Sequence, residues 1–160
     1  MTTSFPFKFV DMGTALPFNI EANPDFPTET EPLCILDNLA TPPAPDTFIT
    51  IGATPDPWEL TFRWATTGGP AAGAWQLDAF LESINPGVGN QQVPGFPKIV
   101  PGVNPQKYDQ TVIVPPLEGS IPAPGVFLFR LFATLRFGPL PKVSVAGRAE
   151  GPLMEFYLPA

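Results

Sequence analysis

The chain has no histidine, a single cysteine and few charges among its 160 residues. Without histidine it lacks the commonest general base and a usual ligand of zinc and non-haem iron sites. One cysteine cannot form an internal disulfide, and Cys34 lies in the apolar run Leu33-Cys34-Ile35-Leu36, where we expect a buried thiol that packs as a small hydrophobic residue. Charged residues make up 14% of the sequence, against about 25% in typical soluble domains, so other residue types must cover the surface.

Enzyme chemistry has little support in the residues that remain. There is no glycine-rich phosphate loop, because Gly68-Gly69-Pro70 places a proline where a donor N–H would be needed. Glu59, Asp78 and Glu82 are expected near one another on the outer face of one hairpin. Exposed carboxylates are ordinarily solvated, whereas a catalytic acid needs burial or a charged neighbour. We therefore expect a protein that is not an enzyme, with no catalytic residue, no cofactor and no metal site.

The sequence also lacks targeting features and concentrated positive charge. Its first residues contain no basic region followed by an apolar stretch, so we expect a cytoplasmic protein, or one that is exported without a cleaved signal or packaged in a particle. The longest apolar run, Val126 to Phe137, contains Arg130 and Arg136 and is too short to span a membrane as a helix. The net charge is −7, and residues 1–60 hold one lysine against nine carboxylates, so we expect no nucleic-acid surface.

Proline is what the sequence has in excess. Its 24 prolines are spread between short apolar runs. Since proline lacks the backbone N–H that helices and sheets use, helices must stay short and strands must fit between the prolines. Apolar residues make up 44% of the chain, which is too rich in large side chains for disorder. A chain of this length suits one domain with one core, here residues 1–160.

Alternation of apolar and polar residues indicates strands. It is clearest from Trp58 to Trp64, from Trp75 to Leu81 after a glycine-rich turn, and from Phe127 to Phe137. Leu77 to Ile84 contains helix-forming residue types, but its position directly after that turn favours a strand. The alternation predicts a core led by the inward-facing residues of these strands: Trp58, Phe62, Trp64, Trp75, Leu77, Phe127, Phe129, Leu131 and Leu135.

Shorter runs predict further strands. These cover residues 5–10, 16–20, 33–37, 47–51, 107–114, 143–145 and 153–158, and the last is expected to follow a turn at Gly151-Pro152. Residues 66–73 are expected to form the loop of a hairpin. About nine or ten strands at this spacing predict an all-β fold, an antiparallel β-sandwich with proline-rich loops.

This strand pattern is similar to immunoglobulin-like and fibronectin-type sandwiches. The likeness rests on an aromatic-rich early strand and on Pro124-Gly125-Val126-Phe127-Leu128-Phe129 entering a long late strand. Two features of that fold are missing: the cysteine pair between the sheets, and the tyrosine whose position Phe127 would take without a hydroxyl to bond back to the backbone. The resemblance therefore implies an architecture and carries no site residues.

Residues 85–105 interrupt the strand pattern. This stretch contains five prolines and four glycines, and we expect little regular structure in it. Connections longer than about 12–15 residues tend to be functional or disordered. Its apolar residues Val93, Phe96, Ile99, Val100 and Val103 indicate that it packs against the domain, because a free linker would not need them. Since these residues need cover, the segment is also our leading candidate for a contact with another protein.

Two non-enzymatic functions remain. In the first, the domain is a structural or adaptor module that acts through contacts with a protein partner or by self-association, as a subunit of a homo-oligomer or a larger assembly. In the second, it binds a carbohydrate or an apolar small molecule on a platform that combines Trp58, Trp64 or Trp75 with Tyr108 or Tyr157. The first is favoured, because tryptophans that alternate with polar residues along a strand usually belong to a core.

Overall fold

The computed structural model describes residues 3–10, 18–21, 32–38, 48–50, 57–115, 124–138 and 145–158, and these form eleven β-strands. The strands are β1 (Thr3–Lys8), β2 (Phe18–Glu21), β3 (Leu33–Asn38), β4 (Phe48–Thr50), β5 (Trp58–Gly68), β6 (Ala71–Ser83), β7 (Gln91–Gln92), β8 (Lys98–Asn104), β9 (Lys107–Val114), β10 (Gly125–Gly138) and β11 (Val145–Leu158). The predicted all-β class is confirmed, and Leu77 to Ser83 lies in β6, as the alternation indicates.

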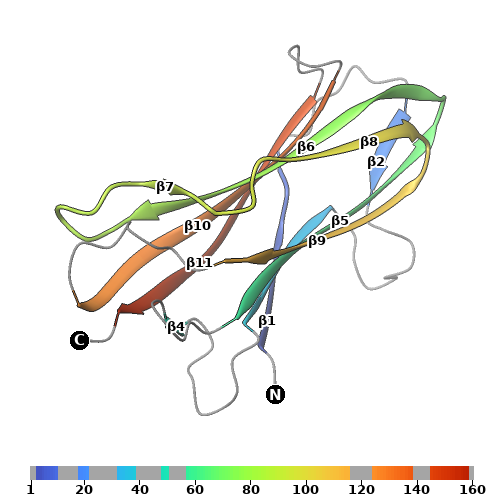
Figure 1. Cartoon of the computed structure of the whole chain (residues 1–160). Helices are drawn as coiled ribbons and strands as arrows, with labels where there is room; N and C mark the ends of the chain where they lie inside the picture. Colours follow the sequence, from blue (N-terminus) through green and yellow to red (C-terminus); the bar gives the residue numbers. More distant parts are fainter. Residues whose placement is uncertain are drawn as a thin grey trace.

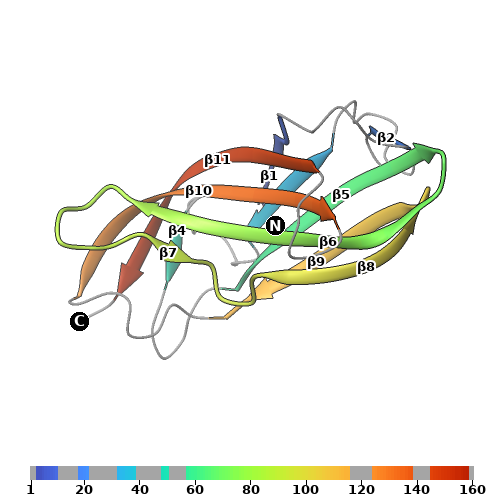
Figure 2. The same ribbon diagram turned by 90° about the horizontal axis from the view of Figure 1, so that it is seen from above.

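The strands form two sheets (Figures 1 and 2). In sheet A, β5 pairs with β9 along one edge and with β3 and β2 along the other, and β1 pairs with β3. In sheet B, the order is β4, β11, β10 and β6, and the far edge of β6 pairs with β7 and β8. Every pairing between named strands is antiparallel except that of β4 with β11.

The connection between β5 and β6 is an arch between the sheets, and the hairpin expected there is wrong. β5 belongs to sheet A and β6 to sheet B, and each pairs with other strands. Gly68 takes a φ of 100°, which an L side chain rarely adopts, and Pro70 follows it. The short connection from β8 to β9 also crosses between the sheets, at the same end of the molecule (Figure 1). The two arches thus turn consecutive strands into opposite layers.

β11 is one continuous strand, so the turn expected at Gly151-Pro152 is also wrong. Arg130 of β10 faces Leu153, whereas Phe132 faces Glu150, so Gly151 and Pro152 lie opposite Leu131 and β11 contains one extra residue. This irregularity is a β-bulge, one of the few places where a strand tolerates proline, because the ladder is already interrupted there.

Residues 85–105 are more regular than the sequence predicts. β8 lies within this stretch and pairs with β6 from Ala71 to Leu77, and the two residues of β7 pair with Phe80 and Leu81. The segment therefore extends sheet B and is not a free loop.

The inner faces of the two sheets share one core. Aromatic rings meet across it: the Trp58 and Phe156 ring centres lie 5.9 Å apart, and those of Trp64 and Trp75 lie 5.3 Å apart. Eight of the nine predicted core residues are buried, and Phe127 is the exception, because it is only partly buried against the core near the start of β10.

Candidate functional site: the outer face of sheet B

The predicted contact residues of segment 85–105 divide between the core and the surface. Val93, Phe96 and Val100 are buried in the hydrophobic core, so that part of the assignment is wrong: these side chains cannot meet a partner while the domain is folded. Ile99 and Val103 alternate with Val100 along β8 and are 47% and 59% exposed. Only these two remain available for a contact, on the outer side of sheet B.

The residues predicted to form a tryptophan platform are also wrong. Trp58, Trp64 and Trp75 are all buried, so none can stack on a ligand from solvent. Tyr108 is buried as well, and its ring stacks on Trp64 with centres 4.6 Å apart. Of the aromatic residues proposed for a platform, only Tyr157 is exposed.

The carboxylates expected together are separated. Glu59 lies on β5 in sheet A, whereas Asp78 and Glu82 lie on β6 in sheet B. Because the arch places β5 and β6 in opposite layers, the outward positions of the two strands are on opposite sides of the domain. Among the described residues, no three cysteine, aspartate or glutamate side chains gather as metal ligands would.

Burial governs the ionisation of the inner side chains. Cys34 is completely buried, and this desolvation raises the pKa of its thiol well above the ordinary value. Burial likewise raises the pKa of Tyr108, and hydrogen bonds with Trp75 and Gln106 partly oppose that shift. The Tyr108 hydroxyl donates to Asn104 Oδ1 at 2.8 Å, so it is satisfied in the neutral form. Both residues are structural.

One end of the outer face of sheet B is apolar. Positions that alternate with the inward-facing Phe129, Met154 and Phe156 point away from the core on β10 and β11. Five apolar side chains project there, four exposed and Leu128 partly exposed, and we call this group the apolar end: Ile84, Val126, Leu128, Leu153 and Tyr157. Val126 and Tyr157 are direct cross-strand partners on β10 and β11, and the N–H of Ile84, the residue after β6, donates to the Leu128 carbonyl, so these residues are neighbours.

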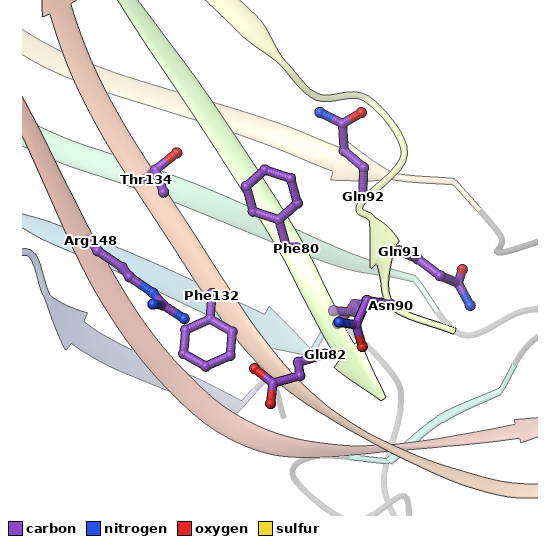
Figure 3. A pocket seen from close by; sticks show the side chains of 9 residues that line it. Phe80, Glu82, Asn90, Gln91, Gln92, Phe132, Thr134 and Arg148 are labelled. Atoms are coloured by element: carbon purple, nitrogen blue, oxygen red, sulfur yellow. The ribbon is translucent and has the colours of Figure 1, made fainter. Parts of the chain in front are cut away.

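The middle of the same face contains a hollow of about 470 Å³ (Figure 3). Phe80 and Phe132 are direct cross-strand partners on β6 and β10 and lie side by side in its wall. We call it the Phe80–Phe132 hollow. Its lining comprises Phe80, Leu81, Glu82, Asn90, Gln91, Gln92, Phe132, Thr134 and Arg148.

A buried carboxylate supports the hollow. Asp78 lies at an outward position of β6, yet it is only 4% exposed. Its Oδ1 accepts a hydrogen bond from Gln92 Nε2 at 2.8 Å, and its Oδ2 lies 3.6 Å from Arg136 Nη2. Asp78 therefore holds the amide of Gln92, whose side chain is part of the lining of the hollow.

Phe132 and Arg148 separate this hollow from a second one. The guanidinium carbon of Arg148 lies 4.0 Å from the centre of the Phe132 ring, a cation–π contact. On the far side is a further hollow of about 470 Å³, lined by Lys8, Val10, Phe132, Arg148 and Glu150. Val10 closes this side by pairing with Arg148 through two backbone hydrogen bonds.

The sequence contains a signal for the Phe80–Phe132 hollow, but a search for core residues alone misses it. Phe80 stands among Gln76, Asp78 and Glu82 at the outward positions of β6. Phe132 stands among Arg130, Thr134 and Arg136 at those of β10. The signal is that each of two strands carries a large aromatic residue at a solvent-side position. Only the register of β6 and β10 shows that these two residues are cross-strand partners.

The described part of the chain contains no helix long and apolar enough to cross a membrane. The sequence matches no family model, and it has no significant match among curated proteins or solved structures.

Proposed function

We propose that this domain is a non-enzymatic β-sandwich of the immunoglobulin-like or fibronectin-like type, and that it acts through contact with another protein chain. The contact surface is the apolar end of the outer face of sheet B. The observation that carries the proposal is the clustering of Ile84, Val126, Leu128, Leu153 and Tyr157 on β10, β11 and the end of β6.

The outer face of a two-layer domain normally carries polar side chains, because apolar side chains there remain in water. Single exposed apolar residues are common, but a contiguous group bordered by charges is typical of a protein contact. Here Arg130 is the cross-strand partner of Leu153, and Glu155 is that of Leu128. The apolar end therefore combines exposed apolar side chains with adjacent charges, a combination that protein contact surfaces use.

The non-enzymatic assignment rests on the side chains present. The whole sequence lacks histidine. Arg130 Nη1 lies 2.6 Å from Glu150 Oε1 in an exposed ion pair, and Asp78 is held by Gln92 and Arg136. These carboxylates are engaged with neighbouring side chains.

Sedimentation velocity of the purified chain tests self-association through this surface. We expect the wild-type protein to sediment as a species larger than its 17.2 kDa chain mass at micromolar concentrations. Val126→Lys should restore the monomer, because it places a charge within the apolar end, beside Tyr157. Ile113→Lys is the matched control: Ile113 is 69% exposed but lies on β9 in sheet A, so this variant should associate like the wild type.

Association that persists in Val126→Lys would overturn this assignment of the contact surface. A wild type that stays monomeric would exclude self-association, and the contact would then be with a different protein. Repeating the sedimentation measurement at low and high salt distinguishes an apolar contact from an electrostatic one. An apolar contact persists at high salt, whereas an electrostatic contact weakens.

A further inference from the structure

The Phe80–Phe132 hollow has the chemistry of a ligand site, and it is separate from the apolar end. We propose that it binds a neutral linear oligosaccharide. The ring of Phe80 forms the apolar contact, the amides beside it bind the hydroxyl groups, and the second hollow beyond Arg148 accepts the next sugar unit. This proposal does not depend on the protein contact proposed above.

The polar groups of the hollow are held in place before any ligand arrives. Gln92 donates one N–H to the buried Asp78, which leaves its Oε1 to accept from a ligand. Asn90 has the opposite orientation: its Oδ1 accepts the Ser83 N–H at 2.9 Å, which leaves its amide group to donate. An acceptor and a donor fixed on the same rim suit a hydroxyl group, which donates and accepts at once. Fixing them in advance reduces the entropy lost on binding.

One wall contributes a further unused group. The Thr134 hydroxyl is buried and has no hydrogen-bond partner within the described part of the chain. A buried hydroxyl without a partner has a free-energy cost that a ligand hydroxyl would relieve.

The apolar part of the hollow suits a sugar ring better than a charged or purely apolar ligand. Phe80 is 37% exposed, and in Figure 3 its ring is seen face-on beside that of Phe132. The face of an aromatic ring is electron-rich and attracts C–H groups, which a sugar ring presents on its flatter side. A purely apolar ligand would leave the amides of Asn90 and Gln92 desolvated without partners.

The charges of the hollow nearly cancel. Glu82 brings one negative charge and Arg148 one positive charge. Neither an anion nor a cation is therefore selected, which favours a neutral ligand. Because Arg148 is stacked on Phe132, its guanidinium is also held in place as a planar donor between the two hollows.

The space accommodates more than one sugar unit. Each hollow measures about 470 Å³, within the range of small-molecule sites, and they share the Phe132–Arg148 wall. A ligand that fills both would run across β6, β10 and β11, perpendicular to the strands. We therefore infer that the ligand is an extended oligosaccharide and not a single sugar.

Titration of the full chain with neutral hexasaccharides tests the proposal. The probes are β-linked hexamers of glucose, xylose, mannose, galactose and N-acetylglucosamine, measured by calorimetry and by the chemical shifts of the amide groups. We expect at least one hexamer to bind with a dissociation constant below about 1 mM, and its disaccharide to bind more weakly because it fills only one hollow. The shifts should gather on β6, β7, β10 and the part of β11 around Arg148.

Two pairs of variants locate the site. Phe80→Ala and Gln92→Ala should each weaken binding about tenfold, which corresponds to about 1.4 kcal/mol. Tyr157→Ala removes another exposed aromatic residue of the same face, and Gln76→Ala removes another outward amide of β6, and both should bind within about twofold of the wild type. Val126→Lys should bind saccharide normally, so failure of the protein contact and failure of the saccharide site are distinguishable.

Three results would overturn the proposal. The first is no binding of any neutral hexamer at about 10 mM. The second is equal loss of affinity in Phe80→Ala and Tyr157→Ala, which would place the site elsewhere. The third is a preference for hexamers of uronic acid, or binding of peptides in place of saccharides with shifts on the same strands, which would show that the hollow recognises a different chemistry.

Discussion

The inner and outer faces of β6 and β10 carry similar large side chains in different surroundings. On the inner face, Trp75, Leu77 and Phe129 are fully buried in one core. On the outer face, Phe80 and Phe132 are also neighbours, but they stay partly exposed beside a buried Asp78, a fixed Gln92 and a stacked Arg148. The inner set stabilises the fold. The outer set includes a buried carboxylate, which adds little to stability and which the proposed saccharide site uses to hold Gln92.

The largest expected difference between the faces is in stability. Phe129→Ala should lower the free energy of unfolding by about 3–5 kcal/mol, because it leaves a cavity in the core. Phe80→Ala should lower it by only about 1 kcal/mol, because this ring already contacts water and its removal leaves no closed cavity. Urea unfolding of both variants measures the difference. Equal losses would show that the outer ring is part of the core and contradict the comparison.

A smaller loss of stability is expected at Gly102, where the core leaves no room for a methyl group. The Cβ of an alanine at position 102 would overlap the Tyr108 hydroxyl, which is held by Asn104. Gly102→Ala should therefore cost about 1–3 kcal/mol. Gly89→Ala is the control, since a Cβ there meets nothing within 4 Å, and it should stay within about 0.5 kcal/mol of the wild type. Thermal unfolding compares the two, and a neutral Gly102→Ala would mean that this end of the core is loosely packed.

The smallest effect concerns the buried thiol. Because burial raises the pKa of Cys34, the folded protein should react slowly with a thiol reagent at pH 9 and rapidly once unfolded in guanidinium. In the unfolded chain the thiol ionises first as the pH rises, so the free energy of unfolding should decrease above about pH 8.5. Cys34→Ala should lack this part of the decrease. Rapid labelling of the native protein would contradict the burial of Cys34.

The sequence predicts the layers of this fold better than its connections. Alternation from Trp58 to Trp64 and from Trp75 to Leu81 correctly identifies the core faces, since burial of one face requires that period. The same residues cannot show whether consecutive strands pair, because a glycine–proline connection suits both a hairpin and the arch observed between β5 and β6. For the same reason Gly151-Pro152 suits a turn as well as the bulge in β11.

The candidate site is harder to predict because it depends on register. Phe80 and Phe132 are 52 positions apart and become neighbours only through the pairing of β6 with β10. Gln92 reaches Asp78 because β7 pairs with β6, in a segment where the sequence predicts little regular structure. The apolar residues of that segment correctly predict that it must be covered. Val93, Phe96 and Val100 are covered by the core of their own domain and not by a partner.

Photo-crosslinking from the two outer faces tests most directly the claim that sheet B carries the contact surface. Benzoylphenylalanine is placed at position 126 on sheet B or at position 113 on sheet A, two sites that are 51% and 69% exposed. After irradiation in the cells that make the protein, we predict a defined protein adduct from position 126 and none from position 113. Adducts from position 113 alone, or equally from both positions, would contradict the account.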